Sequence, residues 1–151
     1  MILIHTKKGM ETIYVEQDFH TSPEKFWKAL TDADEMRQWY FDIPDFELLV
    51  GSTFSFYEPG GENNYLHRCT ITEIIPYQKF SHTWTHPNET KGITMVTWLL
   101  ENNEKGIIKL KFSHEGIEQL ADAGPAFARE NYEAGWNEII KTSLLKFLEN
   151  H

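Results

Sequence analysis

Hydrophobic and polar residues alternate along several short segments of the chain, a pattern typical of half-buried β-strands. Within Glu11–Phe19, the side chains of Ile13, Val15 and Phe19 share one face, whereas Glu16 lies on the other. The same pattern, bounded by turn residues, predicts further strands at Phe46–Val50, Thr53–Tyr57, Tyr65–Ile75, Lys79–His86, Ile93–Glu101 and Ile107–Glu115. Because most of these segments are joined by short turns, we expect one antiparallel sheet of seven strands.

Two short helices are predicted directly after the first strand. Ser22 followed by Pro23 is typical of an N-cap and a first helical residue, because the missing N–H of proline is not needed there. Asp32 or Asp34 can cap a second helix that runs to Trp39. The interruption between them predicts a bend rather than one long helix.

The last third of the chain predicts one long helix over Pro125–Asn150. Its apolar residues recur every three or four positions, which makes a broad stripe suited to lie along a sheet. Gly135 interrupts this helix and costs about 1 kcal/mol relative to alanine. Its presence indicates either close approach to a strand or room beside Trp136. The glycine-rich segment 58–64 predicts a loop.

The composition narrows the class of protein. The chain has 151 residues, a length that fits a single domain covering 1–151, and carries 14 basic against 23 acidic residues, a net charge of −9. This charge argues against nucleic acid and anionic membranes as partners. The lone Cys69 excludes an internal disulfide. The short apolar run at the start does not predict a secretion signal, and no stretch approaches the ~20 apolar residues of a membrane span, so we expect a cytoplasmic protein.

Two pairs of side chains, His82 with His86 and His67 with Cys69, are candidates for a metal site or a catalytic site. His82 and His86 share a strand face but lie ~13 Å apart along it, too far to bind one metal ion. His67 and Cys69 are two residues apart, so contact between them is conceivable, yet no third group that would activate the thiol is evident, which favours a small buried thiol. The chain has no nucleophile elbow and no phosphate-binding glycine loop. We therefore expect no metal, no cofactor and no catalytic residue.

Four strings of the sequence resemble those of the activator-of-Hsp90-ATPase-like family, which belongs to the START/Bet v 1-like (helix-grip) superfamily. They are TSPEKFWKALTDADEMRQWY, GSTFSFY, MVTWLLENNEKGIIKLKFSHEG and GWNEIIKTSLLKFL. They occur in the family's order and spacing, and the resemblance covers residues 12–148. Ile107–Ile108 depart from the family, in which many members carry Gly-Thr-Arg or similar.

The resemblance implies an α+β helix-grip fold: a curved seven-stranded antiparallel sheet, two short helices after the first strand, and the long C-terminal helix over the sheet. It also implies an apolar cavity between sheet and helix, with Met36, Trp39 and Tyr40 expected at its edge. Further residues expected to line it are Phe54, Phe56, His67, Cys69, Phe80, His82, Trp84, Trp98, Phe112, Tyr132, Trp136 and Ile140. A solid core built from the same residues is the alternative reading. His114 is expected as a polar plug near the open end.

Three functions are compatible with this sequence. Relatives in the superfamily hold lipids, polyketides or flavonoid-like molecules, so the leading hypothesis is a binding protein for a small hydrophobic or aromatic molecule. The second is a module that interacts with an Hsp90-type chaperone, which rests on the family resemblance. The third is a cyclase or hydrolase that acts through His67, His82 or His114.

The strand 93–101 is expected to turn Val96, Trp98 and Leu100 inward.

Overall fold

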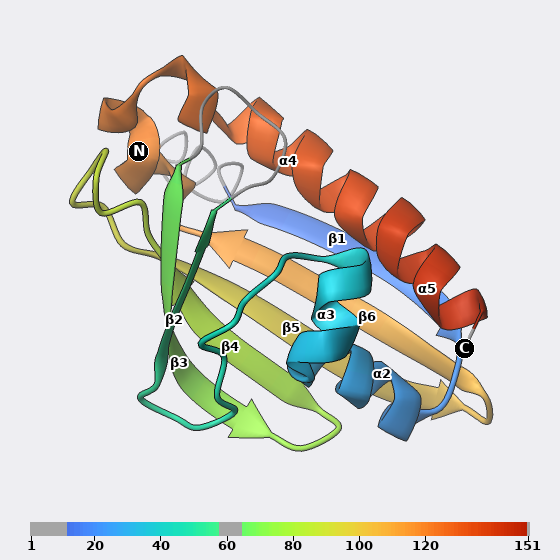
Figure 1. Cartoon of the computed structure of the whole chain (residues 1–151). Coiled ribbons are helices and arrows are strands. Elements are labelled where there is room, and N and C mark those ends of the chain that lie inside the picture. Colours follow the sequence, from blue (N-terminus) through green and yellow to red (C-terminus); the bar gives the residue numbers. More distant parts are fainter. Residues whose placement is uncertain (1–11, 58–64, 151) are drawn as a thin grey trace.

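The computed structural model describes residues 12–57 and 65–150, so the loop expected at 58–64 lies outside the described residues. The fold is α+β, as predicted, and its sheet is antiparallel with the strand order β1-β6-β5-β4-β3-β2 (Figure 1). The strands are β1 (Ile13–His20), β2 (Thr53–Tyr57), β3 (Leu66–Ile75), β4 (Lys79–Trp84), β5 (Thr94–Glu104) and β6 (Ile107–Glu115). Consecutive strands from β2 to β6 pair with one another, and β1 closes the order by pairing with β6.

The helices gather on one face of this sheet (Figure 1). They are α2 (Pro23–Thr31), α3 (Ala33–Trp39), two 3₁₀ helices (Ile117–Ala123 and Pro125–Phe127), and a C-terminal helix made of α4 (Arg129–Glu138), a π-helical segment (Ile139–Leu144) and α5 (Leu145–Glu149). The C-terminal helix contacts β1 along its length, its π-helical segment contacts α3, and α5 contacts α2. Within the described residues, none of these helices combines the length and apolar character needed to cross a membrane.

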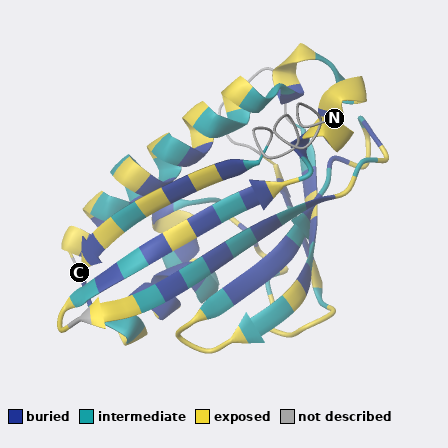
Figure 2. Cartoon of the chain, turned by 180° about the vertical axis from the view of Figure 1, so that it is seen from behind, coloured by how far each residue is buried: buried dark blue, intermediate teal, exposed yellow. Residues whose placement is uncertain are grey.

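Alternation along the strands separates the two faces of the sheet. Figure 2 shows buried and more exposed residues following one another along β1 and β6. On β5, Val96, Trp98 and Leu100 are buried, which confirms the inner face chosen from the sequence. The buried side chains of the strands and those of the helices form one hydrophobic cluster.

The capping signals of the first two helices are confirmed. Ser22 Oγ accepts a hydrogen bond from the N–H of Lys25 at 3.1 Å, with Pro23 as the first helical residue. Asp32 ends α2 and caps α3, since its Oδ2 accepts from the N–H of Glu35 at 3.1 Å. The bend between the helices is therefore fixed by one residue that serves both.

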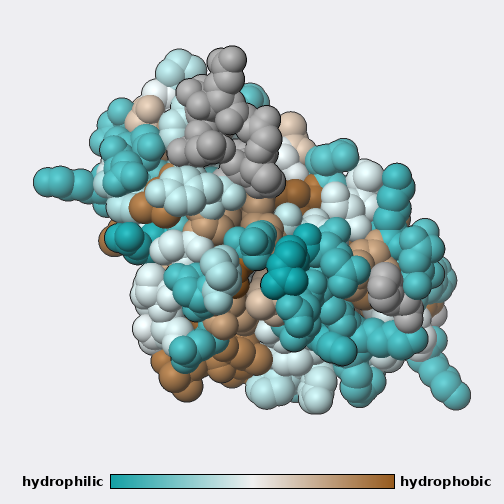
Figure 3. Space-filling model, in the orientation of Figure 1, coloured by the Kyte–Doolittle hydropathy of each residue, from teal (hydrophilic) through white to brown (hydrophobic). Residues whose placement is uncertain are grey.

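The strand predicted at Phe46–Val50 is wrong, so the described sheet has six strands instead of seven. This segment forms turns and irregular backbone that ends at Gly51, whose φ of 92° is in the left-handed region that favours glycine. Leu48, Leu49 and Val50 are exposed and form a hydrophobic patch at the lower left of Figure 3. The segment is apolar and has strand propensity, but in the described sheet no strand pairs with it, so it does not form a strand.

The predicted helix over Pro125–Asn150 is also corrected. Its first residues form the separate 3₁₀ turn, and Ala128 is extended, so the continuous helix begins at Arg129. Farther on, buried residues recur in steps of four at Trp136, Ile140, Leu144 and Leu148. Steps of four drift by about 40° each around a regular α-helix. The π-helical segment has more residues per turn and offsets part of that drift, which keeps the four on one face.

Strand β2 forms one edge of the sheet. The backbone N–H of Ser55 does not bond to β3 but donates to Oδ1 of Asp45 at 3.2 Å. Asp45 lies in the connection between α3 and β2. Its carboxylate thus occupies a hydrogen-bonding position on the free side of the edge strand.

Candidate functional site

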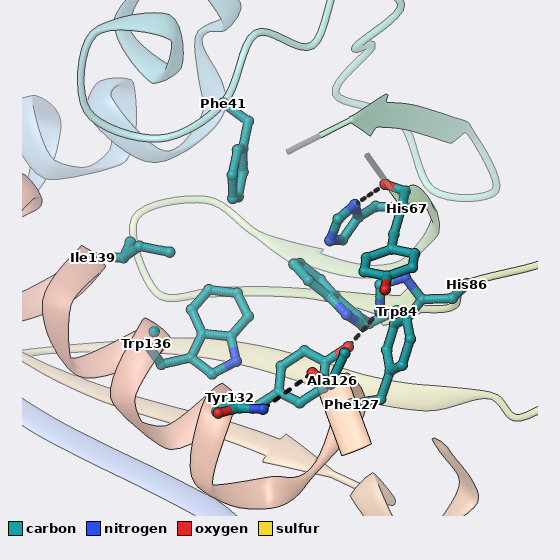
Figure 4. A pocket seen from close by; sticks show the side chains of 12 residues that line it. Phe41, His67, Trp84, His86, Ala126, Phe127, Tyr132, Trp136 and Ile139 are labelled. Atoms are coloured by element: carbon teal, nitrogen blue, oxygen red, sulfur yellow. Dashed lines mark hydrogen bonds between the residues drawn. The ribbon is translucent and has the colours of Figure 1, made fainter. Parts of the chain in front are cut away.

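A cavity of about 290 Å³ lies between the C-terminal helix and the sheet (Figure 4). Its volume is near the lower end of the range for small-molecule sites. Its lining is mainly aromatic and consists of Phe41, Tyr65, His67, Trp84, His86, Ala126, Phe127, Asn131, Tyr132, Gly135, Trp136 and Ile139. Asn131 and Gly135 are exposed, which places them at its mouth.

Two histidines of the wall have tautomers fixed by their partners. His67 Nδ1 lies 2.9 Å from the carbonyl oxygen of Tyr65, and His86 Nδ1 lies 3.2 Å from that of Leu66. A carbonyl only accepts hydrogen bonds, so Nδ1 carries the proton in both rings. Nε2 of His86 then accepts the hydroxyl proton of Tyr132, which joins the sheet to α4 across the cavity wall.

His114 lies deeper and connects three strands with the helix. The indole Nε1–H of Trp136 donates to His114 Nδ1 at 3.0 Å. His114 Nε2–H therefore donates to Thr94 Oγ1 at 2.7 Å, and this hydroxyl donates to the carbonyl of Trp84 at 2.7 Å. His114 is fully buried within this chain of bonds rather than a plug at the open end. It positions Trp136 and Trp84, both of which line the cavity.

Burial keeps these rings neutral. Loss of hydration lowers the pKa of His67, His82 and His86 to about 4, with the neighbouring His86 adding to the effect on His67. Burial, together with His82 and His86, lowers the pKa of His114 to about 3. At neutral pH the cavity wall therefore carries no positive charge from its histidines.

The structure brings only some of the expected residues to the cavity. His67, Trp84, Tyr132 and Trp136 line it. The others expected there are buried in the surrounding core or packed against it, without being part of the lining: Met36, Trp39, Tyr40, Phe54, Phe56, Cys69, Phe80, His82, Trp98, Phe112 and Ile140. They hold the lining residues in place, as where the ring of Phe56 stacks on His67 with centroids 4.6 Å apart.

Trp39 lies inside the core rather than at the edge of the cavity. Its Nε1–H donates to the carbonyl of Ala29 at 2.8 Å, and its ring packs edge-on against Trp98. We therefore expect Trp39→Ala to lower the free energy of unfolding by ~3–5 kcal/mol. Phe26→Ala, at a fully buried position in the same core, is the matched control of similar cost. Urea unfolding measures both, and a loss below ~1 kcal/mol for Trp39→Ala would contradict the core assignment.

Several lining residues were not expected from the sequence. Tyr65 and His86 extend the inward alternation of His67 and Trp84 by one step beyond β3 and β4. The sequence already placed His86 on the same face as His82, although it was not among the residues expected to line the cavity. Asn131, Gly135 and Ile139 are neighbours of Tyr132 and Trp136 in the predicted helix, so the position of these two aromatic residues could have indicated them as well. No sequence pattern indicated Phe41 or Ala126–Phe127. They reach the cavity because of irregular backbone at Phe41 and the helix break at Ala128.

A metal site and an activated thiol were the two other kinds of site considered from the sequence. No group of three or more His, Cys, Asp or Glu side chains in residues 12–57 and 65–150 is arranged to hold a metal ion. Cys69 is buried, and burial raises the pKa of its thiol well above the ordinary value, which disfavours the nucleophilic thiolate. Cys69 and His67, whose contact the sequence left open, form no hydrogen bond with each other within the described part of the chain.

The family of the chain follows from its match to a family model. The model of Activator of Hsp90 ATPase homolog 1-like proteins matches residues 20–149. The chain belongs to this family. A search of curated proteins found no match.

Several solved structures share this fold. A protein from Mesorhizobium loti, MLL2253, is 23% identical with a TM-score of 0.76, over 92% of this chain and 97% of that one. The Aha1 dimer from Colwellia psychrerythraea is 26% identical with a TM-score of 0.73, over 91% and 96% of the two chains. An HSP90 activator from Plasmodium falciparum is 21% identical with a TM-score of 0.62, over 88% and 90%.

Proposed function

We propose that this protein binds a small hydrophobic or aromatic molecule in the cavity between the sheet and the C-terminal helix. The observation that carries the proposal is the cavity itself, about 290 Å³ walled mainly by aromatic rings. Aromatic side chains offer large apolar contact areas in fixed orientations, which suits a flat or compact apolar ligand. A ligand that buries roughly 300 Å² gains ~7.5 kcal/mol, and association costs of ~4 kcal/mol or more leave at most ~3.5 kcal/mol, so apolar contacts alone predict affinity in the millimolar range.

Native mass spectrometry of gently purified protein tests this function directly, because a retained ligand adds its mass. Tryptophan fluorescence then gives affinity, since Trp84 and Trp136 line the cavity. A panel of fatty acids, polyphenols and polycyclic aromatics is titrated from about 10 µM up to the solubility limit of each compound, in keeping with the expected millimolar affinity. If no compound co-purifies and none alters the fluorescence of the wild type, the proposal is wrong.

Gly135 provides a variant that separates binding from stability. A Cβ atom placed on Gly135 would meet nothing within 4 Å, so the glycine leaves open space at the cavity mouth. We expect Gly135→Ala to raise the free energy of unfolding by ~0.5–1 kcal/mol because alanine favours the helix. Gly135→Leu should keep most of that gain, yet weaken ligand uptake by narrowing the mouth. Thermal melting and ligand titration measure the two effects, and tighter binding by Gly135→Leu would contradict the position of the mouth.

The family match favours a second candidate, interaction with an Hsp90-type chaperone. Its support is the name of the family model that matches residues 20–149. The test is the ATPase rate of a purified Hsp90 with and without this protein, together with a pull-down. Gly135→Leu serves as the control here. An interaction through the protein surface should not depend on the width of the cavity mouth, so this variant should affect the ATPase rate as the wild type does. No binding and no change in rate would exclude this role.

A further inference from the structure

His67 presents a hydrogen-bond acceptor to the cavity in a fixed direction. Its Nδ1–H is engaged with the carbonyl of Tyr65, so Nε2 of the neutral ring carries a lone pair. Figure 4 shows this second ring nitrogen directed into the space bordered by Phe41, Trp84 and Trp136. Reversal of the ring would break the part-buried hydrogen bond to the Tyr65 carbonyl.

The surrounding rings hold His67 in this orientation. Phe56 stacks on it with an interplanar angle of 11°. Trp84 and His86 meet it edge-on, with centroids 5.0 and 4.6 Å away. Groups preorganised in this way lose little conformational freedom when a ligand binds, so their hydrogen bonds contribute more to affinity.

The second histidine of the wall does not offer the same group. Nε2 of His86 already accepts from the Tyr132 hydroxyl, and its Nδ1–H is bonded to Leu66. The two rings are therefore inequivalent although they lie side by side. A hydrogen-bond donor on a ligand would find its acceptor at His67.

Charge restricts the ligand further. With the histidines neutral, no residue among the described lining of the cavity carries a formal charge. A carboxylate placed beside His67 Nε2 would face a lone pair and no cation, and burial of an unpaired charge is strongly unfavourable. A neutral hydroxyl meets no such penalty and satisfies the acceptor.

We infer that the ligand is a neutral hydroxyaryl compound, a flat molecule of one or two aromatic rings whose hydroxyl donates to His67 Nε2. This inference rests on the proposed function and specifies the ligand class for the same cavity. The rings of the ligand contact the aromatic wall, and its hydroxyl fixes its orientation. A molecule of two fused rings is compatible with the volume of about 290 Å³.

The test uses a matched series of naphthalene, 2-naphthol, 2-methoxynaphthalene and 2-naphthoate, titrated into the full chain at pH 7.5. The methoxy compound keeps the oxygen of 2-naphthol but lacks its donor hydrogen. We expect 2-naphthol to bind roughly tenfold more tightly than 2-methoxynaphthalene, the effect of one net hydrogen bond, and 2-naphthoate to bind most weakly.

Two variants assign the preference to His67. His67→Phe keeps an aromatic ring but removes the acceptor, so the ratio between 2-naphthol and 2-methoxynaphthalene should fall to about one while naphthalene still binds. His67→Gln retains an acceptor oxygen and should restore part of the ratio. Circular dichroism checks that both variants fold. The affinity ratio measured on the wild type tests the inference even if a variant does not fold.

The outcomes separate this inference from the proposed function. Equal affinity of the wild type for 2-naphthol and 2-methoxynaphthalene, or preferred binding of 2-naphthoate, overturns the inference and leaves the cavity as a binding site. An undiminished preference in His67→Phe also overturns it. If no member of the series binds and the wider panel fails as well, both the inference and the proposed function fall.

Discussion

Acidification from pH 6.5 to pH 5 is expected to lower the stability of this protein steeply. The pKa values of His67, His82, His86 and His114 lie at about 4 or about 3 in the folded chain, below the ordinary value of 6.5. The unfolded chain therefore binds protons first, and stability that is complete above pH 6.5 is lost as the pH falls toward the folded-state values. For His82 alone, a pKa lowered to about 4 corresponds to roughly 3 kcal/mol.

Urea unfolding at intervals between pH 7.5 and 5 measures this loss, in a range where most carboxylates stay ionised. The slope of the unfolding free energy against pH counts the extra protons that the unfolded chain binds. His82→Phe should reduce that slope by about one proton. A flat profile across this range would contradict the neutral buried state of these rings.

His114→Leu is expected to cost ~2–4 kcal/mol of stability. The substitution preserves apolar volume but leaves the indole N–H of Trp136 without its acceptor in a buried site. It also removes ring contacts with Trp84, Tyr132 and Trp136. Because the same bond orients Trp136 on the cavity wall, ligand affinity should fall together with stability.

A double-mutant cycle isolates the bond. Trp136→Phe removes the donor, so His114→Leu should cost less in that background, with a coupling energy of about 1 kcal/mol or more. Thr94→Val is the matched control on the other side of the His114 ring, because it removes the hydroxyl that accepts from His114 Nε2. Costs of His114→Leu and Trp136→Phe that simply add would show that the bond contributes nothing measurable.

Local patterns in the sequence were sufficient for most of the regular elements. The alternation that turns Val96 and Trp98 inward, and the caps at Ser22 and Asp32, depend on neighbouring residues alone. The family resemblance supplied the arrangement of helix and sheet. The segment Phe46–Val50 failed because strand formation requires a partner, which local propensity does not reveal.

The cavity was harder to predict because its wall depends on where regular structure stops. Phe127 lines the cavity because the helix is broken at Ala128. Trp39 does not line it because its indole N–H is bonded to the carbonyl of Ala29 in the core. The tautomers of His67 and His86 follow from carbonyl groups of Tyr65 and Leu66, whose positions only the folded backbone defines.

The bond between Asp45 and Ser55 has a consequence for behaviour at high concentration. A free edge strand is a template on which strands of other molecules can assemble. Here the Asp45 carboxylate already occupies the outward N–H of Ser55, so an incoming strand would have to displace a charged group from that position. The sheet is thereby terminated at β2, next to the exposed Leu48–Val50 patch where self-association would otherwise be most favourable.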